Sequence, residues 1–198
     1  MTGMDEPEFK EDLHRYLRTA RATLLWKLEG LEEYDVRRPL VATGTNLLGL
    51  VKHVASMELA YFGVVFNRPF EPEPAWMADD APPNSDMWAT ADETREQIVA
   101  FYHRASSHAD STIDALDIAA VGAVPWWGEE SRVTLHQVMV HVVDETSRHV
   151  GHADIVRELI DGTVGLNGAN DNLATDDPQW WRAYRRQLEA VANQFHRP

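Results

Sequence analysis

Two residues in the segment 135–160 interrupt an apolar stripe with side chains that can bind a metal ion. The stripe, at spacings of three, four or seven residues, runs through Leu135, Val138, Val142, Glu145, His149, Val156 and Leu159. Helical periodicity places Glu145 and His149 on the line that faces the core, where an ionised carboxylate is costly unless it is paired or binds a metal. Because these two residues are four apart, they share one helix face and can reach one ion at the roughly 2.0–2.2 Å typical of zinc.

A histidine in the segment 46–66 occupies a similar position. The second stripe runs through Asn46, Leu50, His53, Met57, Ala60 and Val64. Neighbouring helix axes lie about 8–10 Å apart, so His53 on one helix and the pair Glu145 and His149 on a facing helix can bridge one ion across a bundle core. Three nitrogen and oxygen ligands leave a coordination position open, which is typical of catalytic zinc rather than structural zinc.

Each of these signals also has an ordinary structural explanation. Glu-x-x-x-His pairs occur on many exposed helices, so Glu145 and His149 could simply pair with each other. A single core histidine such as His53 is more often hydrogen-bonded than metal-bound. The two signals strengthen each other because both lie on core stripes, but the residues alone leave both interpretations open.

Two further histidines lie beside the stripe on the fourth predicted helix. His141 precedes Glu145 by four residues, and His152 follows His149 by three. Either could orient a ligand or hold a proton, although for His141 we prefer a partly exposed position without such a role. The histidines without a supporting pattern are interpreted as surface residues: His14, His103, His108 and His196.

Helical periodicity dominates the segments that must position these side chains. It predicts four long helices and a shorter fifth one, over about 9–31, 47–66, 90–116, 134–160 and 178–195. Thr90 and Glu93 form a capping-box pattern at the start of the third helix. Thr134 and Gln137 form the same pattern at the start of the fourth helix, which Gly162 is expected to close.

The remaining segments read as connections. Five prolines exclude a long regular element from residues 67–89, whose role the sequence does not indicate, and no segment shows a convincing strand alternation. The sequence therefore predicts an all-α fold, a four-helix bundle with a long connection between its second and third helices and an extra C-terminal helix. We expect a single domain over 1–198, with the bundle core at about 8–162 and a loop plus the C-terminal helix at 163–198.

The composition limits the partners and the chemistry. With 18 Lys and Arg against 32 Asp and Glu, the formal net charge is −14, which argues against binding to nucleic acids or to an anionic membrane surface. The absence of cysteine excludes disulfides, cysteine-type zinc sites and a cysteine nucleophile. The acidic N-terminus is not a signal peptide, and no run approaches 18 apolar residues, so we expect a cytoplasmic protein that does not cross a membrane.

At the two candidate ligand motifs the sequence resembles a known family. Residues 48–54 (LGLVKHV), followed by Glu58, and residues 144–154 (DETSRHVGHAD), followed by RELIDG at 157–162, are similar to the DinB-like superfamily of metal-binding four-helix bundles. Many members use three histidines as ligands. Here the first position on the fourth helix is Glu145, as in mycothiol S-transferases and in the metal domain of mycothiol-dependent maleylpyruvate isomerase, which use His, Glu and His.

This resemblance covers about residues 8–162 and implies a ligand set and a cofactor. The implied ligands are His53, Glu145 and His149, and the implied cofactor is a divalent metal ion, with Zn²⁺ as the expected one. The isomerase has an additional C-terminal domain that contributes to its activity, and 198 residues are too few to contain one. The resemblance therefore favours a transferase role in detoxification over maleylpyruvate isomerisation.

The expected chemistry follows from an open coordination position. A divalent ion there deprotonates a bound thiol and holds the thiolate as a nucleophile near neutral pH. The resemblance makes mycothiol, or another low-molecular-weight thiol, the expected first substrate, and an electrophilic small molecule the second. His152 is the candidate for proton handling. The residues expected to contact the substrates are Tyr61, Trp126, Trp127, Arg148 and Arg157.

Two other functions are compatible with the same residues. The open metal position could activate water, which would make the protein a metal-dependent hydrolase. The bundle could instead be a non-enzymatic stress protein that binds a metal or small ligand. The sequence names neither the electrophile nor the physiological metal, and it is compatible with a monomer or a homodimer.

Overall fold

The computed structural model of the protein describes residues 6–196. Its contacts divide the chain into two compact units, and the boundary in the sequence lies between Thr163 and Val164. The first unit holds the bundle, and the second holds a loop and the C-terminal helix. Helices make up most of the described chain, with one small sheet of two strands. The predicted all-α class is therefore confirmed.

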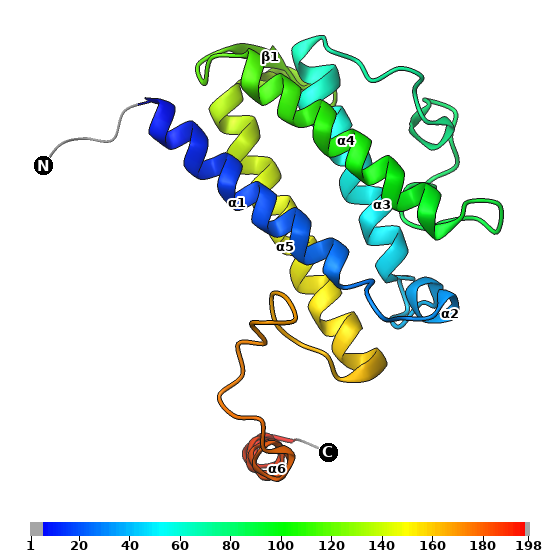
Figure 1. Cartoon of the computed structure of the whole chain (residues 1–198), viewed down its shortest axis with the longest axis vertical. Helices are drawn as coiled ribbons and strands as arrows, with labels where there is room; N and C mark the ends of the chain where they lie inside the picture. Colours follow the sequence, from blue (N-terminus) through cyan, green and yellow to red (C-terminus); the bar gives the residue numbers. More distant parts are fainter. Residues whose placement is uncertain (1–5, 197–198) are drawn as a thin grey trace, which may run out of the picture. The chain divides into compact units, whose positions relative to one another are not determined.

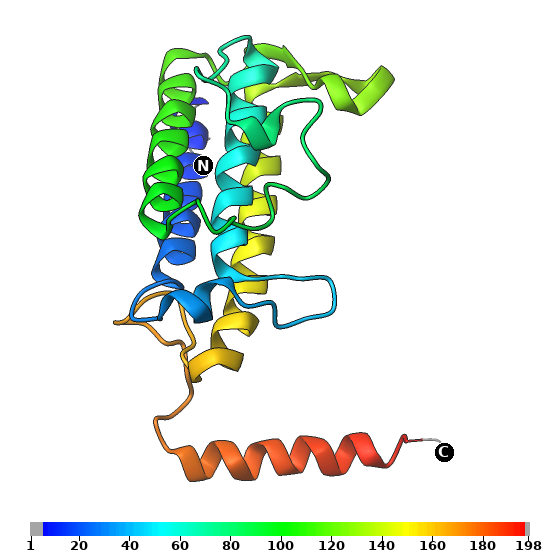
Figure 2. The ribbon, with the colours of Figure 1, turned by 90° about the vertical axis from the view of Figure 1, so that its right-hand side faces the viewer.

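Four long helices form the first unit: α1 (Glu6–Trp26), α3 (Leu47–Glu58), α4 (Arg95–Ala115) and α5 (Leu135–Asp161). Helix α3 packs against α4 and α5, and α1 packs against α5 (Figure 1). Figure 2 shows that α3 and α4 run in the same direction. The connection between them must therefore return along the bundle, which explains its length.

The second and fourth predicted helices have the expected ends. The Asn46 side chain accepts a hydrogen bond from the Gly49 amide at 2.7 Å and starts α3. A π-helical turn η1 (Leu59–Gly63) and a 3₁₀ turn η2 (Val64–Phe66) carry the helix on to residue 66. Helix α5 begins at the predicted capping box of Thr134 and Gln137, and it ends at Gly162, whose φ of 78° suits glycine.

Two predicted helix ends are wrong. Helix α1 ends at Trp26, and residues 27–30 form a turn in which Gly30 has a φ of 74°. Helix α4 begins after Thr94, whose side chain forms the capping box with Gln97. At Thr90 only half of the predicted box is present: Glu93 accepts from the Thr90 amide, but the Glu93 amide donates to the Thr90 carbonyl at 3.2 Å, so these residues form a turn before the helix.

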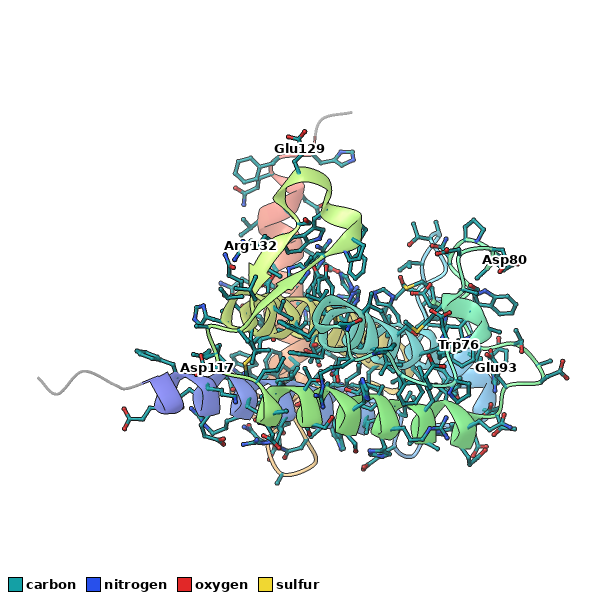
Figure 3. All side chains as sticks on the ribbon, turned by 90° about the horizontal axis from the view of Figure 1, so that it is seen from above. Trp76, Asp80, Glu93, Asp117, Glu129 and Arg132 are labelled. Carbon is teal, nitrogen blue, oxygen red and sulfur yellow. The ribbon has the colours of Figure 1, made fainter. Side chains whose placement is uncertain are left out.

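Several short elements outside the predicted helices were not predicted. Helix α2 (Glu33–Arg37) follows α1, and the 3₁₀ turn η3 (Ala75–Met77) lies in the long connection. Strands β1 (Val121–Ala123) and β2 (Arg132–Thr134) form an antiparallel hairpin whose tip is the 3₁₀ segment η4 (Pro125–Glu130). Figure 3 shows Glu129 and Arg132 on this hairpin, which projects from the helices, and Trp76 and Asp80 on the long connection. Strands of three residues are too short to show an alternation.

The apolar residues of the bundle form its core. The segment Leu47–Phe66 is long and apolar enough to cross a membrane by length and composition, but 78% of its most apolar window is buried inside the protein. Packing against α4 and α5 therefore accounts for its apolar character. On α5 the predicted stripe is buried as far as Val156 except at Glu145, whose side chain is 28% exposed, and Leu159 is 62% exposed because Ile160 faces the core instead.

A group of charged residues is buried between α1, α3 and α4. The Arg21 guanidinium donates to both carboxylate oxygens of Glu58 at 2.7 Å, and to Asp110 at 2.6 Å. His14, predicted at the surface, is instead 7% exposed and lies 2.8 Å from the same Asp110 carboxylate. That carboxylate gives the imidazole a partner and allows its burial.

The second unit contains α6 (Pro178–Asn193), close to the predicted fifth helix. The Asp177 side chain accepts from the Gln179 amide at 2.8 Å and caps the helix, and Pro178 occupies the first helical position, where its missing N–H costs nothing. Its larger apolar side chains are half-exposed, among them Trp180, Tyr184, Leu188 and Val191.

Candidate metal centre

The two histidines singled out by the sequence meet at the contact between α3 and α5. The rings of His53 and His149 lie edge to face, with centroids 4.7 Å apart. The side chain of His149 is 11% exposed and that of His53 is 26% exposed. The site is therefore enclosed on the α5 side and open to solvent beside α3.

Glu145 lies one turn before His149 on the same face of α5. Its carboxylate oxygen Oε2 is 3.7 Å from His149 Nε2. Two ligands of one tetrahedral zinc ion, each about 2.1 Å from it, lie about 3.4 Å from each other. The spacing of this pair is within a few tenths of an ångström of that value.

The environment of His149 keeps its imidazole neutral. Burial is the largest cause, and the nearby His53, His152 and Arg148 add to it, so that the pKa of His149 falls to about 4. Atom Nδ1 of His149 is buried and has no hydrogen-bond partner within the described part of the chain. A neutral imidazole is the form that binds metal ions.

The residue that orients His53 was missed by the sequence analysis. Asp86, on the connection between α3 and α4, lies with Oδ2 2.6 Å from His53 Nδ1. This hydrogen bond from His53 is the main cause that lowers the pKa of Asp86, so the carboxylate is the acceptor and Nδ1 the donor. In the neutral imidazole with its proton on Nδ1, Nε2 is the nitrogen that can bind an ion, as in the carboxylate–histidine–zinc arrangement.

The donor set fits a divalent ion in its chemistry. Two imidazoles and one carboxylate are typical zinc ligands, and the spacing of 3.7 Å between Glu145 Oε2 and His149 Nε2 suits a shared ion. Among residues 6–196, however, no three histidine or acidic side chains are already gathered as a metal-binding group. The ligand set of His53, Glu145 and His149 therefore stays a prediction.

A cleft of about 290 Å³ opens beside His53. It is lined by Asp86 and by apolar and aromatic side chains that include Tyr61, Trp76 and Trp126. The Tyr61 ring contacts Trp126 and Trp127, with centroids 5.3 and 6.1 Å away. The predicted aromatic residues Tyr61 and Trp126 thus form part of one wall with His53.

The other predicted site residues occupy different surroundings. The His152 ring is exposed and lies 5.5 Å from the His149 ring, centroid to centroid. Arg148 is exposed. Arg157 is buried, and its guanidinium binds the Asp161 carboxylate and the carbonyl oxygens of Lys27 and Glu29. Arg157 thus joins α5 to the turn that follows α1, and these contacts occupy most of its donors.

His141 belongs to the aromatic group rather than to the ligands. Its ring lies 4.6 Å from that of Tyr61 and 5.2 Å from that of Trp127, between centroids. A larger hollow of about 520 Å³ lies near residues 84–88 and is lined by Arg37, Asn46 and Trp88 among others. It contains none of the candidate ligands, so we place the site in the smaller cleft.

Comparison with solved structures supports the fold. The crystal structure of a conserved protein from Enterococcus faecalis is similar to this chain, with a TM-score of 0.50 and 16% sequence identity. The match covers 81% of this chain and 99% of the other. At this identity it shows a shared fold alone. Among curated proteins, no match is found.

Comparison with protein families identifies a relationship for most of the chain. The profile of the family described as mycothiol S-transferase matches residues 12–162. The matched region begins within α1 and ends at the Gly162 that closes α5, so it spans nearly all of the bundle and includes both histidines of the candidate centre. The chain belongs to the mycothiol S-transferase family, a DinB-like family, as its two motifs had indicated.

Proposed function

We propose that the protein is a metal-dependent thiol S-transferase that joins mycothiol, or a similar low-molecular-weight thiol, to an electrophilic small molecule. The observation that carries this proposal is the contact between the rings of His53 and His149, with Glu145 3.7 Å from His149, in a chain of the mycothiol S-transferase family. These three residues would hold the ion, and Zn²⁺ suits them best.

Each ligand has a distinct part in this proposal. His149 binds as a neutral imidazole because its buried surroundings disfavour the protonated form. Glu145 contributes the negative charge that offsets part of the charge of a divalent cation. His53 would bind the ion through Nε2, because its Nδ1 donates a hydrogen bond to Asp86. A divalent ion in such a site lowers the pKa of a bound thiol, so that the thiol is ionised near neutral pH.

The reaction then forms one carbon–sulfur bond. The thiol gives up its S–H proton, its sulfur attacks the electrophilic carbon, and the leaving group departs with the bonding electron pair. His152, exposed beside His149, would receive the thiol proton and pass it to water. Tyr61 and Trp126 would hold the apolar part of the electrophile and reduce the access of water to the sulfur.

The composition supports a thiol substrate in a specific way. The chain has no cysteine, so a thiolate nucleophile has to come from a small molecule. We further propose that the protein acts in the cytoplasm as a monomer or a homodimer. In this proposal neither a nucleic acid nor a membrane is a partner.

A comparison of several thiols against one electrophile tests the function. Zinc-loaded protein is incubated with a chromogenic aryl halide and mycothiol, glutathione, cysteine or no thiol, and the products are identified by mass spectrometry. We expect a thioether, formed fastest with mycothiol. Conversion of the electrophile without thiol would favour a hydrolase, and tight metal binding without any turnover would favour a binding protein.

A further inference from the structure

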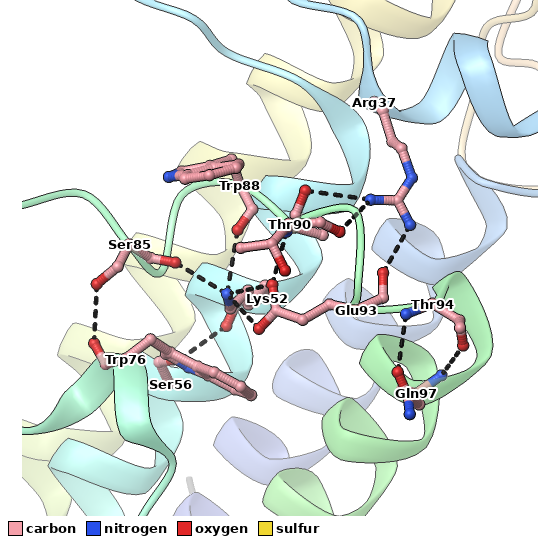
Figure 4. Close-up of polar contacts among 11 residues, drawn as sticks. Arg37, Lys52, Ser56, Trp76, Ser85, Trp88, Thr90, Glu93, Thr94 and Gln97 are labelled. Carbon is pink, nitrogen blue, oxygen red and sulfur yellow. Dashed lines mark hydrogen bonds and ion pairs between the residues drawn. The ribbon is translucent and has the colours of Figure 1, made fainter. Parts of the chain in front are cut away.

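Next to His53 on α3 stands a buried lysine. The side chain of Lys52 is 1% exposed, and its ammonium donates to both carboxylate oxygens of Glu93 at 2.8 and 2.9 Å (Figure 4). It also donates to the carbonyl oxygens of Ser85 at 2.9 Å and Trp88 at 3.1 Å. A buried ammonium needs such partners, because removing it from water is otherwise costly.

All these partners belong to the connection between α3 and α4, and another contact ties Lys52 to an earlier part of the same connection. The Lys52 ammonium lies 4.1 Å from the centre of the Trp76 ring, at the distance of a cation–π interaction. The Trp76 indole donates to Ser56 Oγ at 3.0 Å, and Ser85 Oγ donates to the Trp76 carbonyl at 3.2 Å. Lys52 on α3 thus contacts two parts of the connection, one at Trp76 and one at residues 85–93.

Asp86 lies between two residues that α3 holds by their backbone. Lys52 binds the carbonyl of Ser85, and Asn46 Nδ2 donates to the carbonyl of Met87 at 3.2 Å. That second carbonyl lies so close to Gly49 that a Cβ atom there would overlap it. The position of Asp86, and with it the hydrogen bond to His53, therefore depends on anchors on either side.

We propose that Lys52 is a positioning residue for the candidate metal centre. By fixing residues 85–93 against α3 it holds Asp86 where that carboxylate accepts a hydrogen bond from His53 Nδ1, which would leave Nε2 to bind a metal ion. This inference rests on the proposed function, because it takes His53 as a ligand. A lysine suits this task because its ammonium offers three donors to two carbonyls and a carboxylate.

A matched pair of variants separates positioning from general stability. Lys27 is the natural control: it is 0% exposed, pairs with Asp154 at 2.7 Å, and lies 4.4 Å from the Trp26 ring. Lys52→Met and Lys27→Met therefore each remove one buried ammonium with an ion pair and a cation–π contact. If Lys52→Met does not fold, the double variant Lys52→Met/Glu93→Gln removes the opposite charge as well.

The first measurement needs no metal. In metal-free protein, the His53 ring proton on Nδ1, hydrogen-bonded to Asp86, should give a downfield NMR resonance, assigned by its loss in His53→Gln. We expect this resonance to persist in Lys27→Met and to disappear in Lys52→Met or in the double variant. Its persistence in the Lys52 variants would overturn the proposal.

The second measurement is the affinity for Zn²⁺ by competition with a chromophoric chelator. Loss of a residue that orients a ligand typically weakens metal binding about 10- to 100-fold, so we expect roughly a tenfold loss for Lys52→Met and little change for Lys27→Met. Equal affinities would overturn the link to the ion. Wild-type protein that shows the resonance but binds no Zn²⁺ would contradict the proposed function and leave the positioning role of Lys52 supported.

Discussion

The rings of His53 on α3 and His149 on α5 meet edge to face, with centroids 4.7 Å apart, at the contact between two helices of the bundle. The apolar residues around them, among them Val54, Val142 and Val150, are buried. The packing of the apolar side chains therefore brings the two rings together. We expect a loss of either ring to affect ion binding more than the stability of the fold.

Replacing either ring should remove the ion and leave the fold. We expect His149→Ala and His53→Ala to lose bound Zn²⁺ and thiol transfer, and to keep the helical circular dichroism spectrum with a stability loss of about 1–3 kcal/mol. Metal analysis of the purified proteins measures the first effect. The exposed His103 supplies the control, because His103→Ala should match the wild type. Full activity in metal-free His149→Ala would refute the ligand assignment.

The aromatic wall should affect the electrophile rather than the ion. Trp126 is 50% exposed and contacts Tyr61 beside the cleft. An aromatic contact contributes about 0.5–1.5 kcal/mol, so Trp126→Ala should raise the KM for an aromatic electrophile about two- to tenfold at unchanged zinc content. Trp88, 51% exposed and lining the other hollow, is the matched control. An equal effect of Trp88→Ala would contradict the assignment of the cleft.

The buried pair of Arg21 and Glu58 should be costly to break. Its two hydrogen bonds of 2.7 Å lie where both side chains are at most 7% exposed. Without Glu58 the buried Arg21 keeps only Asp110 as a carboxylate partner, so Glu58→Ala should lower the free energy of unfolding by about 3 kcal/mol, the lower end of the range for a broken buried pair. The exposed pair of Arg15 and Asp12 gives the comparison, since Arg15→Ala should cost less than about 1 kcal/mol. Urea unfolding measures both, and equal losses would show that burial is unimportant here.

Asp110 should make the fold sensitive to acid. Burial alone would raise the pKa of Asp110, but its ion pair and hydrogen bond with Arg21, helped by His14, lower it below the usual 3.8. Because the folded pKa lies below the unfolded one, this carboxylate stabilises the fold above about pH 4, and the contribution is lost as the pH falls through the folded pKa. The stability difference between wild type and Asp110→Asn, from urea unfolding, should therefore be largest near pH 6 and shrink below about pH 4. A difference that does not shrink would contradict the shift.

Periodicity and capping chemistry in the sequence predict most of the bundle. Thr134 with Gln137 and the closing Gly162 mark both ends of α5 because these residues act on their own backbone. The cap of α4 was misplaced because two successive capping-box patterns, Thr90 with Glu93 and Thr94 with Gln97, stand four residues apart, and the second forms the complete box. The hairpin of β1 and β2 was missed because its strands are only three residues long.

Some residues of the candidate site could likewise be predicted from the sequence, and others could not. His53, Glu145 and His149 could be found because they interrupt apolar stripes on regular helices. Asp86 could not, because it lies in a connection without periodicity and reaches His53 only through the folding of that connection. A signal for the buried ion pair does exist in the sequence, since Arg21 lies between Leu17 and Leu24 on the stripe of α1.

The most direct test of the central claim is zinc X-ray absorption spectroscopy of the loaded protein with and without mycothiol. The chain contains no cysteine, so a thiolate at the ion can come only from the substrate. We predict a shell of nitrogen and oxygen ligands alone without mycothiol, and one added sulfur at about 2.3 Å with it. A spectrum that mycothiol leaves unchanged, in wild-type protein with a full zinc content, would contradict the account.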